Sequence, residues 1–292
     1  MINLYNAIQQ SNLFPKMIVN DLLFVEYTCM REETKLGIWS NNNYFAFISS
    51  GKKAWRTIYH NYEVEDGDIL FVKKGANLTH QFFGEEFCAV FMFLPDDFIK
   101  SFLQKNAILI DGKQKSLYGQ DAVIRIQPDE LLVNYSQSVR AYLSQSIKPP
   151  EQILLLKFEE LLFSLFSNKN QQPLTDYFIS LCQSRQYQLI RVIEENFAYN
   201  LAVEDYARLC HMSLSTFKKA FFQQYAATPA VWLKEKKLEL SYQKLLNTEA
   251  VISQVALECG FEDTSHFIRV FKKRYGLTPL RCRQEYSKKP AE

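Results

Sequence analysis

The sequence predicts an α+β protein of two domains, and three observations support that prediction. The first hundred residues contain short runs rich in β-branched and aromatic residues, separated by polar turns. From Pro128 the apolar residues recur at steps of three and four, which is a helical period. Beyond about residue 185 the chain is helical throughout and contains an internal repeat. A length of 292 residues also fits two domains better than one.

Short strands separated by polar turns are typical of a small sandwich or barrel. The turn signals of this region are Gly51-Lys52-Lys53, Glu65–Asp68, Lys74–Asn77 and Gly84. The predicted strands are Leu22–Tyr27, Tyr44–Ile48, Ala54–Tyr59, Ile69–Val72 and Phe87–Phe93.

A strongly apolar helix is predicted over Glu151–Phe166, after the break at Pro149-Pro150. Its main stripe consists of Leu154, Leu155, Phe158, Leu161, Leu162 and Leu165. Ile153, Leu156, Phe163 and Phe166 widen that stripe, so the helix needs a cover on two sides. One cover is the barrel of its own chain. Two possibilities remain open for the second cover. It is either a second subunit, which would make this a dimerisation helix, or a purely intramolecular core.

The stretch Ser167–Thr175 is polar and has the composition of a linker. We therefore expect a regulatory and dimerisation domain over 1–168, a linker over 169–184 and a helical domain over 185–292. Residues 185–292 carry 17 basic and 12 acidic residues, a net charge of +5, whereas residues 1–184 have a net charge of −3. A basic helical domain beside a slightly acidic one suits the binding of a polyanion.

Composition also limits the classes of protein. No apolar run approaches the ~20 residues of a membrane-spanning helix, and residues Met1–Gln10 do not resemble a secretory signal. The expected location is the cytoplasm, without a membrane partner. The six cysteines show no metal-ligand or redox spacing, so neither a metal nor a cofactor is expected.

The helical region contains two copies of one unit. Phe217, Phe221, Tyr225, Thr228 and Pro229 recur 50 positions later as Phe267, Phe271, Tyr275, Thr278 and Pro279. Ala207 and Met212 recur as Ala256 and Phe261 at an offset of 49, so the turn is one residue longer in the second copy. Each copy is predicted to be a short helix, a tight turn and a longer helix.

In the first copy we expect a turn at His211-Met212 and a helix capped by Ser213. The expected inward residues are Val203, Tyr206, Ala207, Cys210, Phe217, Ala220, Phe221 and Tyr225, and the expected outward residues are Ser215, Lys218, Lys219 and Phe222.

In the second copy Gly260 suits a left-handed turn, and Asp263 or Thr264 is expected to cap the second helix. The expected inward residues are Val251, Val255, Ala256, Phe267, Val270 and Phe271, and the expected outward residues are Thr264, Ser265, Ile268, Arg269 and Lys272.

A helix that exposes hydroxyl groups, Lys and Arg near its N-terminus suits the major groove of DNA. Thr228 and Pro229 are expected to begin a rigid helix over Pro229–Leu246, about 27 Å long at 1.5 Å per residue. That length is close to the ~34 Å between successive major grooves on one face of DNA. The pattern therefore predicts two helix-turn-helix units, joined by a linker helix, that read two adjacent grooves.

The stretch Leu201–Arg283 resembles the DNA-binding domain of the AraC/XylS family of bacterial regulators. The second copy carries the match in Ile252–Ala256, Cys259–Asp263, Tyr275–Pro279 and Arg281–Arg283. Two residues depart from the family pattern: His211 stands where the family often has Gly, and Lys237 where it usually has Arg. Ser215 is also a small residue for a base-reading position.

The resemblance implies a transcriptional regulator, an activator above all, that binds double-stranded DNA beside promoters and acts on RNA polymerase. It implies base contacts from Ser215, Thr216, Lys218, Lys219, Thr264, Ser265, His266 and Arg269. We expect phosphate contacts from Ser213, Lys272, Lys273 and Arg274.

The N-terminal half resembles the ExsA-type, cupin-like regulatory domain of type III secretion activators, through Glu65–Gly75. That resemblance implies a cupin-like β-barrel whose partner is a protein. From the residues alone we expect regulation by a small-molecule effector inside the barrel, and control by a protein partner or homodimerisation is the alternative. A small molecule would meet the aromatic candidates Trp39, Phe45, Trp55, Tyr59 and Phe82.

A metal-dependent cupin enzyme is the remaining alternative, and it requires clustered histidines and a carboxylate. The barrel offers only His60 and His80, while Lys73, Gly75 and Leu78 stand at the positions of the second cupin motif. No nucleophile motif or Gly-rich phosphate loop is present. The sequence therefore predicts a regulator rather than an enzyme.

Overall fold

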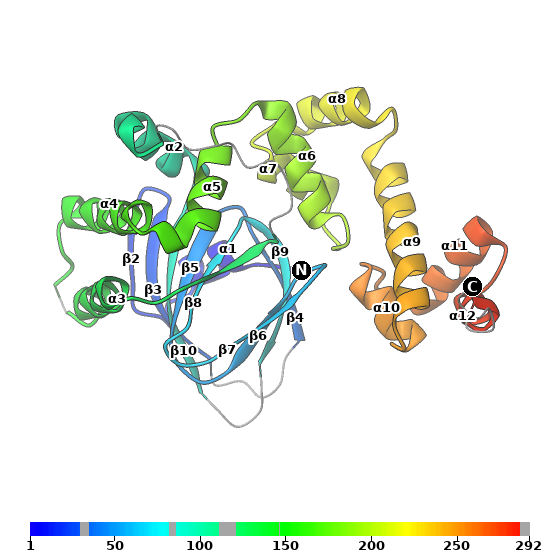
Figure 1. Ribbon diagram of the computed structural model, residues 1–292, viewed down its shortest axis with the longest axis horizontal. Coiled ribbons are helices and arrows are strands. Elements are labelled where there is room, and N and C mark those ends of the chain that lie inside the picture. Colours follow the sequence, from blue (N-terminus) through cyan, green and yellow to red (C-terminus); the bar gives the residue numbers. More distant parts are fainter. Residues whose placement is uncertain (30–34, 82–85, 111–120, 146, 287–292) are drawn as a thin grey trace. The chain divides into compact units, whose positions relative to one another are not determined.

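We describe the protein from a computed structural model, which defines residues 1–292 apart from 30–34, 82–85, 111–120, 146 and 287–292. The chain divides into two compact units, Met1–Gln188 and Leu189–Glu292 (Figure 1). The first unit combines β-sheets with helices and the second is helical, which confirms the α+β class. Every helix within the described ranges is too short or too polar to cross a membrane.

The described strands of the first unit form a five-stranded and a six-stranded sheet. Their strand orders are β1-β4-β9-β6-β7 and β11-β8-β5-β10-β3-β2, and all neighbours are antiparallel except β1 and β4. The strands are β1 Ile2–Asn3, β2 Lys16–Val19, β3 Leu22–Cys29, β4 Lys35–Ser40, β5 Asn43–Ser50, β6 Lys53–Arg56, β7 Asn61–Val64, β8 Ile69–Val72, β9 Gly75–Gln81, β10 Phe87–Leu94 and β11 Val123–Ile126.

The five predicted strands occur as β3, β5, β6, β8 and β10. Strand β6 stops at Arg56, because the chain then turns and the Thr57 N–H donates to the carbonyl of His60 at 2.9 Å. The predicted turn at Lys74–Asn77 is wrong, since Gly75 opens strand β9. Strand β9 pairs with β4 on one side and β6 on the other, and neither pairing is visible in local sequence.

The six-stranded sheet is buried on both faces, as strand β5 shows. Tyr44, Ala46 and Ile48 lie in the apolar cluster that also contains Trp55 of the other sheet. The Trp55 indole N–H donates to the Tyr44 hydroxyl at 3.0 Å, which joins the two sheets. Phe45 and Phe47 point the opposite way, into the cluster formed with the helices. A strand covered on both faces reads as a continuous apolar run.

Helices α2 to α5 pack on the outer face of the six-stranded sheet (Figure 1). Phe158 of α4 lies against Phe24 of β3, with ring centroids 4.1 Å apart. The helices of the first unit are α1 Leu4–Gln10, α2 Asp96–Lys105, α3 Glu130–Leu143, α4 Glu151–Ser167 and α5 Gln172–Ser180, with short 3-10 turns at Ala107–Ile110 and Lys169–Gln171.

The prediction of a linker over 169–184 is wrong for its central part, because helix α5 is packed into the core of the first unit. Leu174, Tyr177 and Phe178 are buried there, and the Phe178 ring meets Phe71 edge-on at 5.3 Å. The polar residues that suggested a linker are used locally. The buried Gln171 side chain donates to the Gln127 carbonyl at 3.0 Å, for example.

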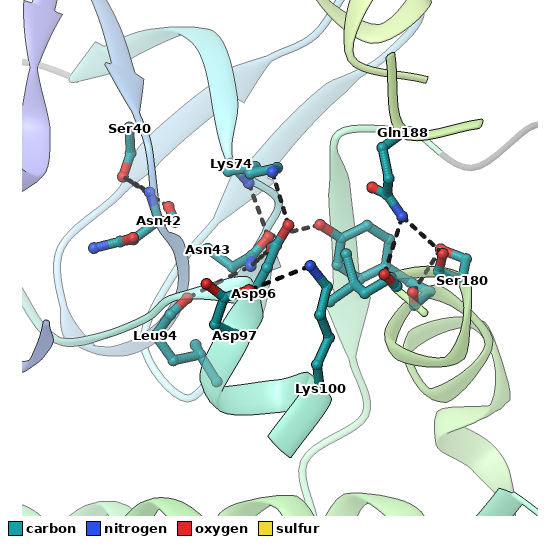
Figure 2. A network of polar contacts seen from close by, with 12 residues as sticks. Ser40, Asn42, Asn43, Lys74, Leu94, Asp96, Asp97, Lys100, Ser180 and Gln188 are labelled. Carbon is teal, nitrogen blue, oxygen red and sulfur yellow. Dashed lines mark hydrogen bonds and ion pairs between the residues drawn. The ribbon is translucent and has the colours of Figure 1, made fainter. Parts of the chain in front are cut away.

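A buried polar network attaches α2 and α5 to the sheet (Figure 2). The Lys74 ammonium pairs with Asp96 at 2.7 Å, and both side chains are at most 3% exposed. The Asn43 amide donates to the second Asp96 oxygen at 2.8 Å, and its carbonyl oxygen accepts from the Tyr177 hydroxyl at 2.7 Å. A buried charge is tolerated when it is paired and hydrogen-bonded in this way.

The second unit is built from the helices α6 Arg185–Asn196, α7 Val203–Leu209, α8 Leu214–Tyr225, α9 Pro229–Asn247, α10 Ile252–Glu258, α11 Thr264–Tyr275 and α12 Pro279–Tyr286. Helix α6 begins four residues before the division between the units. Within the second unit, α9 runs from the α7–α8 pair to the group formed by α10, α11 and α12 (Figure 1).

Candidate nucleic-acid interface

The first helix pair, α7 and α8, is joined by a turn of four residues in which His211 adopts a φ of 53°. Histidine tolerates this left-handed conformation better than most residues. The Ser213 hydroxyl accepts the backbone N–H of Thr216 at 3.2 Å, so the predicted cap is confirmed.

Aromatic side chains hold the first pair together and fix it to its neighbours. Tyr206 and Phe217 are fully buried and stack with ring centroids 6.4 Å apart. The Tyr206 hydroxyl donates to the Asn196 carbonyl at the end of α6, at 2.9 Å. Trp232 of α9 lies against both Phe221 and Tyr225, at 5.8 and 4.5 Å. Helix α8 is therefore held at a defined angle to α6 and α9.

The predicted base-contacting residues of the first pair lie on the outer face of the first turns of α8. Ser215, Thr216, Lys218 and Lys219 are all exposed. The Ser213 hydroxyl lies 3.1 Å from that of Ser215 and 2.8 Å from that of Thr216. These hydroxyl groups form a polar helix end that can donate to and accept from bases or phosphates.

The second pair, α10 and α11, repeats this arrangement. Its turn spans five residues and is one residue longer than the first, as the sequence comparison predicts. Gly260 has a φ of 75° at the position that corresponds to His211. The Asp263 carboxylate caps α11 by accepting the N–H groups of Ser265 and His266, at 2.7 and 3.0 Å. These two hydrogen bonds hold the pKa of Asp263 below its ordinary value.

The core of the second pair differs from the prediction at two positions. Val255, Ala256, Phe267 and Phe271 are buried as expected. Val251 was expected to face inward, but it is the N-terminal cap residue of α10 and is 62% exposed. Ile268 was expected outward, but it packs against the core cluster.

Basic and hydroxyl side chains cover the outer face of α11. Ser265, His266 and Arg269 are exposed, and Thr264 is half-buried. Lys272 and Lys273 are exposed on the later turns. Arg274 was expected to contact phosphate, but its Nε donates to the Glu235 carboxylate of α9 at 2.7 Å. Both side chains are about half-exposed, so the phosphate contact of Arg274 stays a prediction.

Helix α9 joins the two pairs and begins at Pro229, with Thr228 as the residue before it. The Thr228 side chain makes no capping hydrogen bond, so only the positions of the predicted start are confirmed. Its 19 residues correspond to about 28 Å.

One group of contacts near the second turn was missed from the sequence. The Lys237 ammonium of α9 donates to the Gly260 carbonyl at 3.3 Å, and the Asn200 amide donates to the Glu262 carboxylate at 2.7 Å. Burial lowers the pKa of Lys237 to about 8. Two signals were available: Lys237 stands where the related family usually has Arg, and it falls within the apolar stripe of α9 formed by Leu233, Leu238 and Leu245.

The aromatic candidates for an effector pocket do not come together in one cavity of the first unit. Trp55 faces the space between the sheets, but Phe45 packs toward the helices on the opposite face. Tyr59 is 65% exposed and lies in the turn after β6. Trp39 is buried, and Phe82 lies outside the described residues. The predicted pocket is therefore wrong for Phe45 and Tyr59.

The main stripe of helix α4 was a candidate for a dimer contact, with an intramolecular core as the alternative, and the structure supports the intramolecular core. Leu154, Phe158, Leu161, Leu162 and Leu165 are buried inside their own unit, and Leu155 is half-buried. They pack against the sheet and neighbouring helices, so they are not available to a partner. The exposed apolar residues of α4 are Leu156 and Phe163, at 58% and 42% exposure.

The two histidines of the first unit, His60 and His80, do not form a shared site. His60 Nδ1 lies 2.6 Å from Asp121 Oδ2, an oxygen that also accepts from Thr57 and Tyr62. His80 lies in strand β9, paired with Ala54 of β6. Within the part of the chain that the structure describes, no three His, Cys, Asp or Glu side chains gather as a metal site.

Comparison with known proteins agrees with this arrangement. Residues 206–285 match a helix-turn-helix domain, and residues 43–177 match the ExsA N-terminal regulatory domain. The chain is 27% identical over 238 residues to the thermoregulatory protein LcrF of Yersinia pestis, covering 81% of this chain and 87% of that protein. It is 27% identical over 219 residues to the transcriptional regulator ExsA of Pseudomonas aeruginosa, covering 75% and 77%.

Among solved structures, ToxT of Vibrio cholerae aligns over 90% of this chain and 98% of its own, with 15% identity and a TM-score of 0.42.

The second unit thus carries the helix-turn-helix domain of DNA-binding transcriptional regulators. The chain therefore combines an N-terminal domain that matches the ExsA regulatory domain with a helix-turn-helix domain of the AraC type, and its relatives LcrF and ExsA are regulators of the AraC family. The family and these relatives regulate transcription and are not enzymes.

Proposed function

We propose that the second unit reads two adjacent major-groove segments of DNA through two helix-turn-helix units, with α8 and α11 as recognition helices. Base contacts come from Ser215, Thr216, Lys218, Lys219, Thr264, Ser265, His266 and Arg269. Phosphate contacts come from Ser213, Lys272 and Lys273. The first unit, Met1–Gln188, forms a cupin-like regulatory domain, and the whole protein activates promoters through contact with RNA polymerase.

One observation supports this proposal above all: the exposed first turns of α8 and α11 carry hydroxyl and cationic groups at equivalent positions of a repeat. Helix N-termini and hydroxyl groups suit phosphates, while Arg and Lys suit guanine edges in the major groove. Helix α9 is slightly shorter than the ~34 Å groove repeat, so binding of both units favours some bending of the duplex.

Selection of bound sequences from a random DNA pool by the full chain tests the proposal. We expect an asymmetric site with two conserved blocks about one helical turn apart. Replacement of Arg269 by alanine should weaken binding to that site by ~1–3 kcal/mol and relax the preference at one base pair.

The matched control is Lys272→Ala, one helical turn further along α11. It should lower affinity almost equally for all sequences and reduce the slope of log affinity against log salt by about one unit. If Arg269→Ala lowers the binding affinity equally for all DNA sequences, Arg269 has no role in base recognition. Recovery of no two-block site by the wild-type chain would reject the proposed function.

For control of activity, the packing of the barrel favours a protein contact over a small molecule between the sheets. Tyr44, Phe91 and Phe93 lie against one another between the sheets, with ring centroids 5.0 to 6.3 Å apart. Phe87 and Trp55 continue this aromatic cluster at 6.0 Å. A small-molecule effector would have to displace these side chains. We therefore place control at a protein surface, and a metabolite remains the second candidate.

We propose that the exposed face of α4, Leu156 and Phe163, joins two copies of the chain. These residues are seven positions apart and so share one side of the helix. Leu156→Glu combined with Phe163→Glu should convert a dimer into a monomer, measured by light scattering on the full chain. The control is Leu13→Glu, an equally large change at a residue that is 85% exposed. A wild-type chain that is monomeric at all concentrations would refute this contact.

A further inference from the structure

Three segments of the second unit meet at the turn of the second helix pair, next to the N-terminal end of α11. They are residues 196–201, which comprise the last residue of α6 and the stretch after it, helix α9 at Lys237, and the turn of residues 259–263. The backbone of Gly260 touches both of the other segments. A Cβ atom placed on Gly260 would lie 2.4 Å from the Ala198 carbonyl oxygen and 2.9 Å from the Lys237 ammonium.

Two polar contacts add to this close approach. Lys237 donates to the Gly260 carbonyl at 3.3 Å, and Asn200 donates to Glu262 at 2.7 Å. The ammonium lies in a largely buried position, where burial lowers its pKa to about 8. A hydrogen bond from a charged donor at such a site is stronger than one at the surface.

The stretch after α6 also holds the first helix pair. The Tyr206 hydroxyl of α7 donates to the Asn196 carbonyl at 2.9 Å, and Tyr206 is fully buried. The same short stretch therefore contacts α7 through residue 196 and the second turn through residues 198 and 200.

Helix α9 packs directly against the second pair, because its Leu238 and Leu245 lie in the same apolar cluster as Phe267 and Phe271. Tyr242 of α9 also stacks on Tyr275 of α11, with ring centroids 4.9 Å apart. The contacts at Gly260 and Glu262 add a separate connection from the second pair to residues 196–201, which further restricts rotation of α11 about α9. Restricting it before binding reduces the conformational entropy that is lost on binding DNA.

We propose that Lys237 and residues 196–201 form a strut that fixes the separation of the two recognition helices and thereby sets the spacing between DNA blocks that the protein accepts. The inference rests on the proposed function. Lys237 is a positioning residue in it and does not itself touch DNA.

The test compares binding of the full chain to its selected site and to the same site with one base pair added between the blocks. That insertion moves one block by about 3.4 Å and rotates it by about 34°. The wild-type chain should bind the altered site roughly tenfold more weakly. We call this ratio of affinities, selected site over altered site, the insertion penalty. The Lys237→Met variant should bind the selected site more weakly than the wild type, and its insertion penalty should be much smaller.

Matched variants separate positioning from charge and from folding. Lys237→Arg should keep the wild-type penalty, because the guanidinium also donates to the Gly260 carbonyl. Lys234→Met removes the same charge from an exposed position of α9 and should leave the penalty unchanged. Asn200→Ala, an exposed substitution, should reduce the penalty without loss of fold, measured by circular dichroism.

An insertion penalty that stays at its wild-type value in both Lys237→Met and Asn200→Ala would overturn the proposed strut. If the wild-type chain still binds a two-block site in that case, the proposed function stands. A wild-type chain that binds no two-block site rejects both proposals.

Discussion

Replacement of Gly260 by alanine is expected to destabilise the second unit by about 3 kcal/mol or more. A φ of 75° costs an alanine about 1 kcal/mol. The larger effect is steric, because the new Cβ would lie 2.4 Å from the Ala198 carbonyl oxygen. That oxygen belongs to the backbone, so the stretch after α6 or the whole second turn has to move. Hydrogen exchange of the α10 and α11 amides in the full chain measures the loss.

Gly276→Ala is the matched control for this prediction. Gly276 has a φ of 78°, and nothing lies within 4 Å of a Cβ placed there. Only the backbone cost of about 1 kcal/mol should therefore appear. The corresponding residue of the first pair is Ala226, which adopts a φ of 51°. Equal losses in the two variants would show that the contact with Ala198 is not a constraint.

Removal of the negative charge of Asp96 is expected to destabilise the first unit by about 3–5 kcal/mol, because Asp96→Asn breaks its buried ion pair with the Lys74 ammonium. Asn43 is bonded to both Asp96 and Tyr177, so the effect should reach α5. Urea unfolding of the full chain and hydrogen exchange of the α5 amides measure it.

Asp97→Asn is the control on the same helix turn. Asp97 pairs with Lys100 at 3.3 Å, but its side chain is 79% exposed, and such pairs contribute about 0–1 kcal/mol. The double variant Lys74→Met with Asp96→Leu removes both charges and should recover much of the lost stability. A loss in Asp96→Asn no greater than that in Asp97→Asn would show that the pair is not a stabilising element.

The helical unit was largely predictable because its signals are local. Caps such as Ser213 and Asp263 bond to N–H groups two or three residues away. The left-handed turns at His211 and Gly260 follow from the repeat and from the conformational preferences of these residues. The residues on the outer faces of α8 and α11 were predicted from the helical period of 3.6 residues.

The first unit was less predictable because its signals are distant in sequence. Strand β9 depends on partners in β4 and β6, and its first residues resemble a turn when considered alone. Helix α5 is polar enough to resemble a linker, yet Tyr177 bonds to Asn43, 134 positions away. The side of the sheet that Phe45 faces depends on register, which a segment by itself does not reveal.

By itself the sequence determined the fold class, the two helix pairs with their caps and turns, and the resemblance to AraC-type regulators. Only the tertiary structure decided that the apolar stripe of α4 is internal, that Arg274 is paired with Glu235, and that Lys237 and Gly260 meet the stretch after α6. The physical reason is range: capping and helical periodicity act within a few residues. Burial and ion pairing depend on which distant segments the fold brings together.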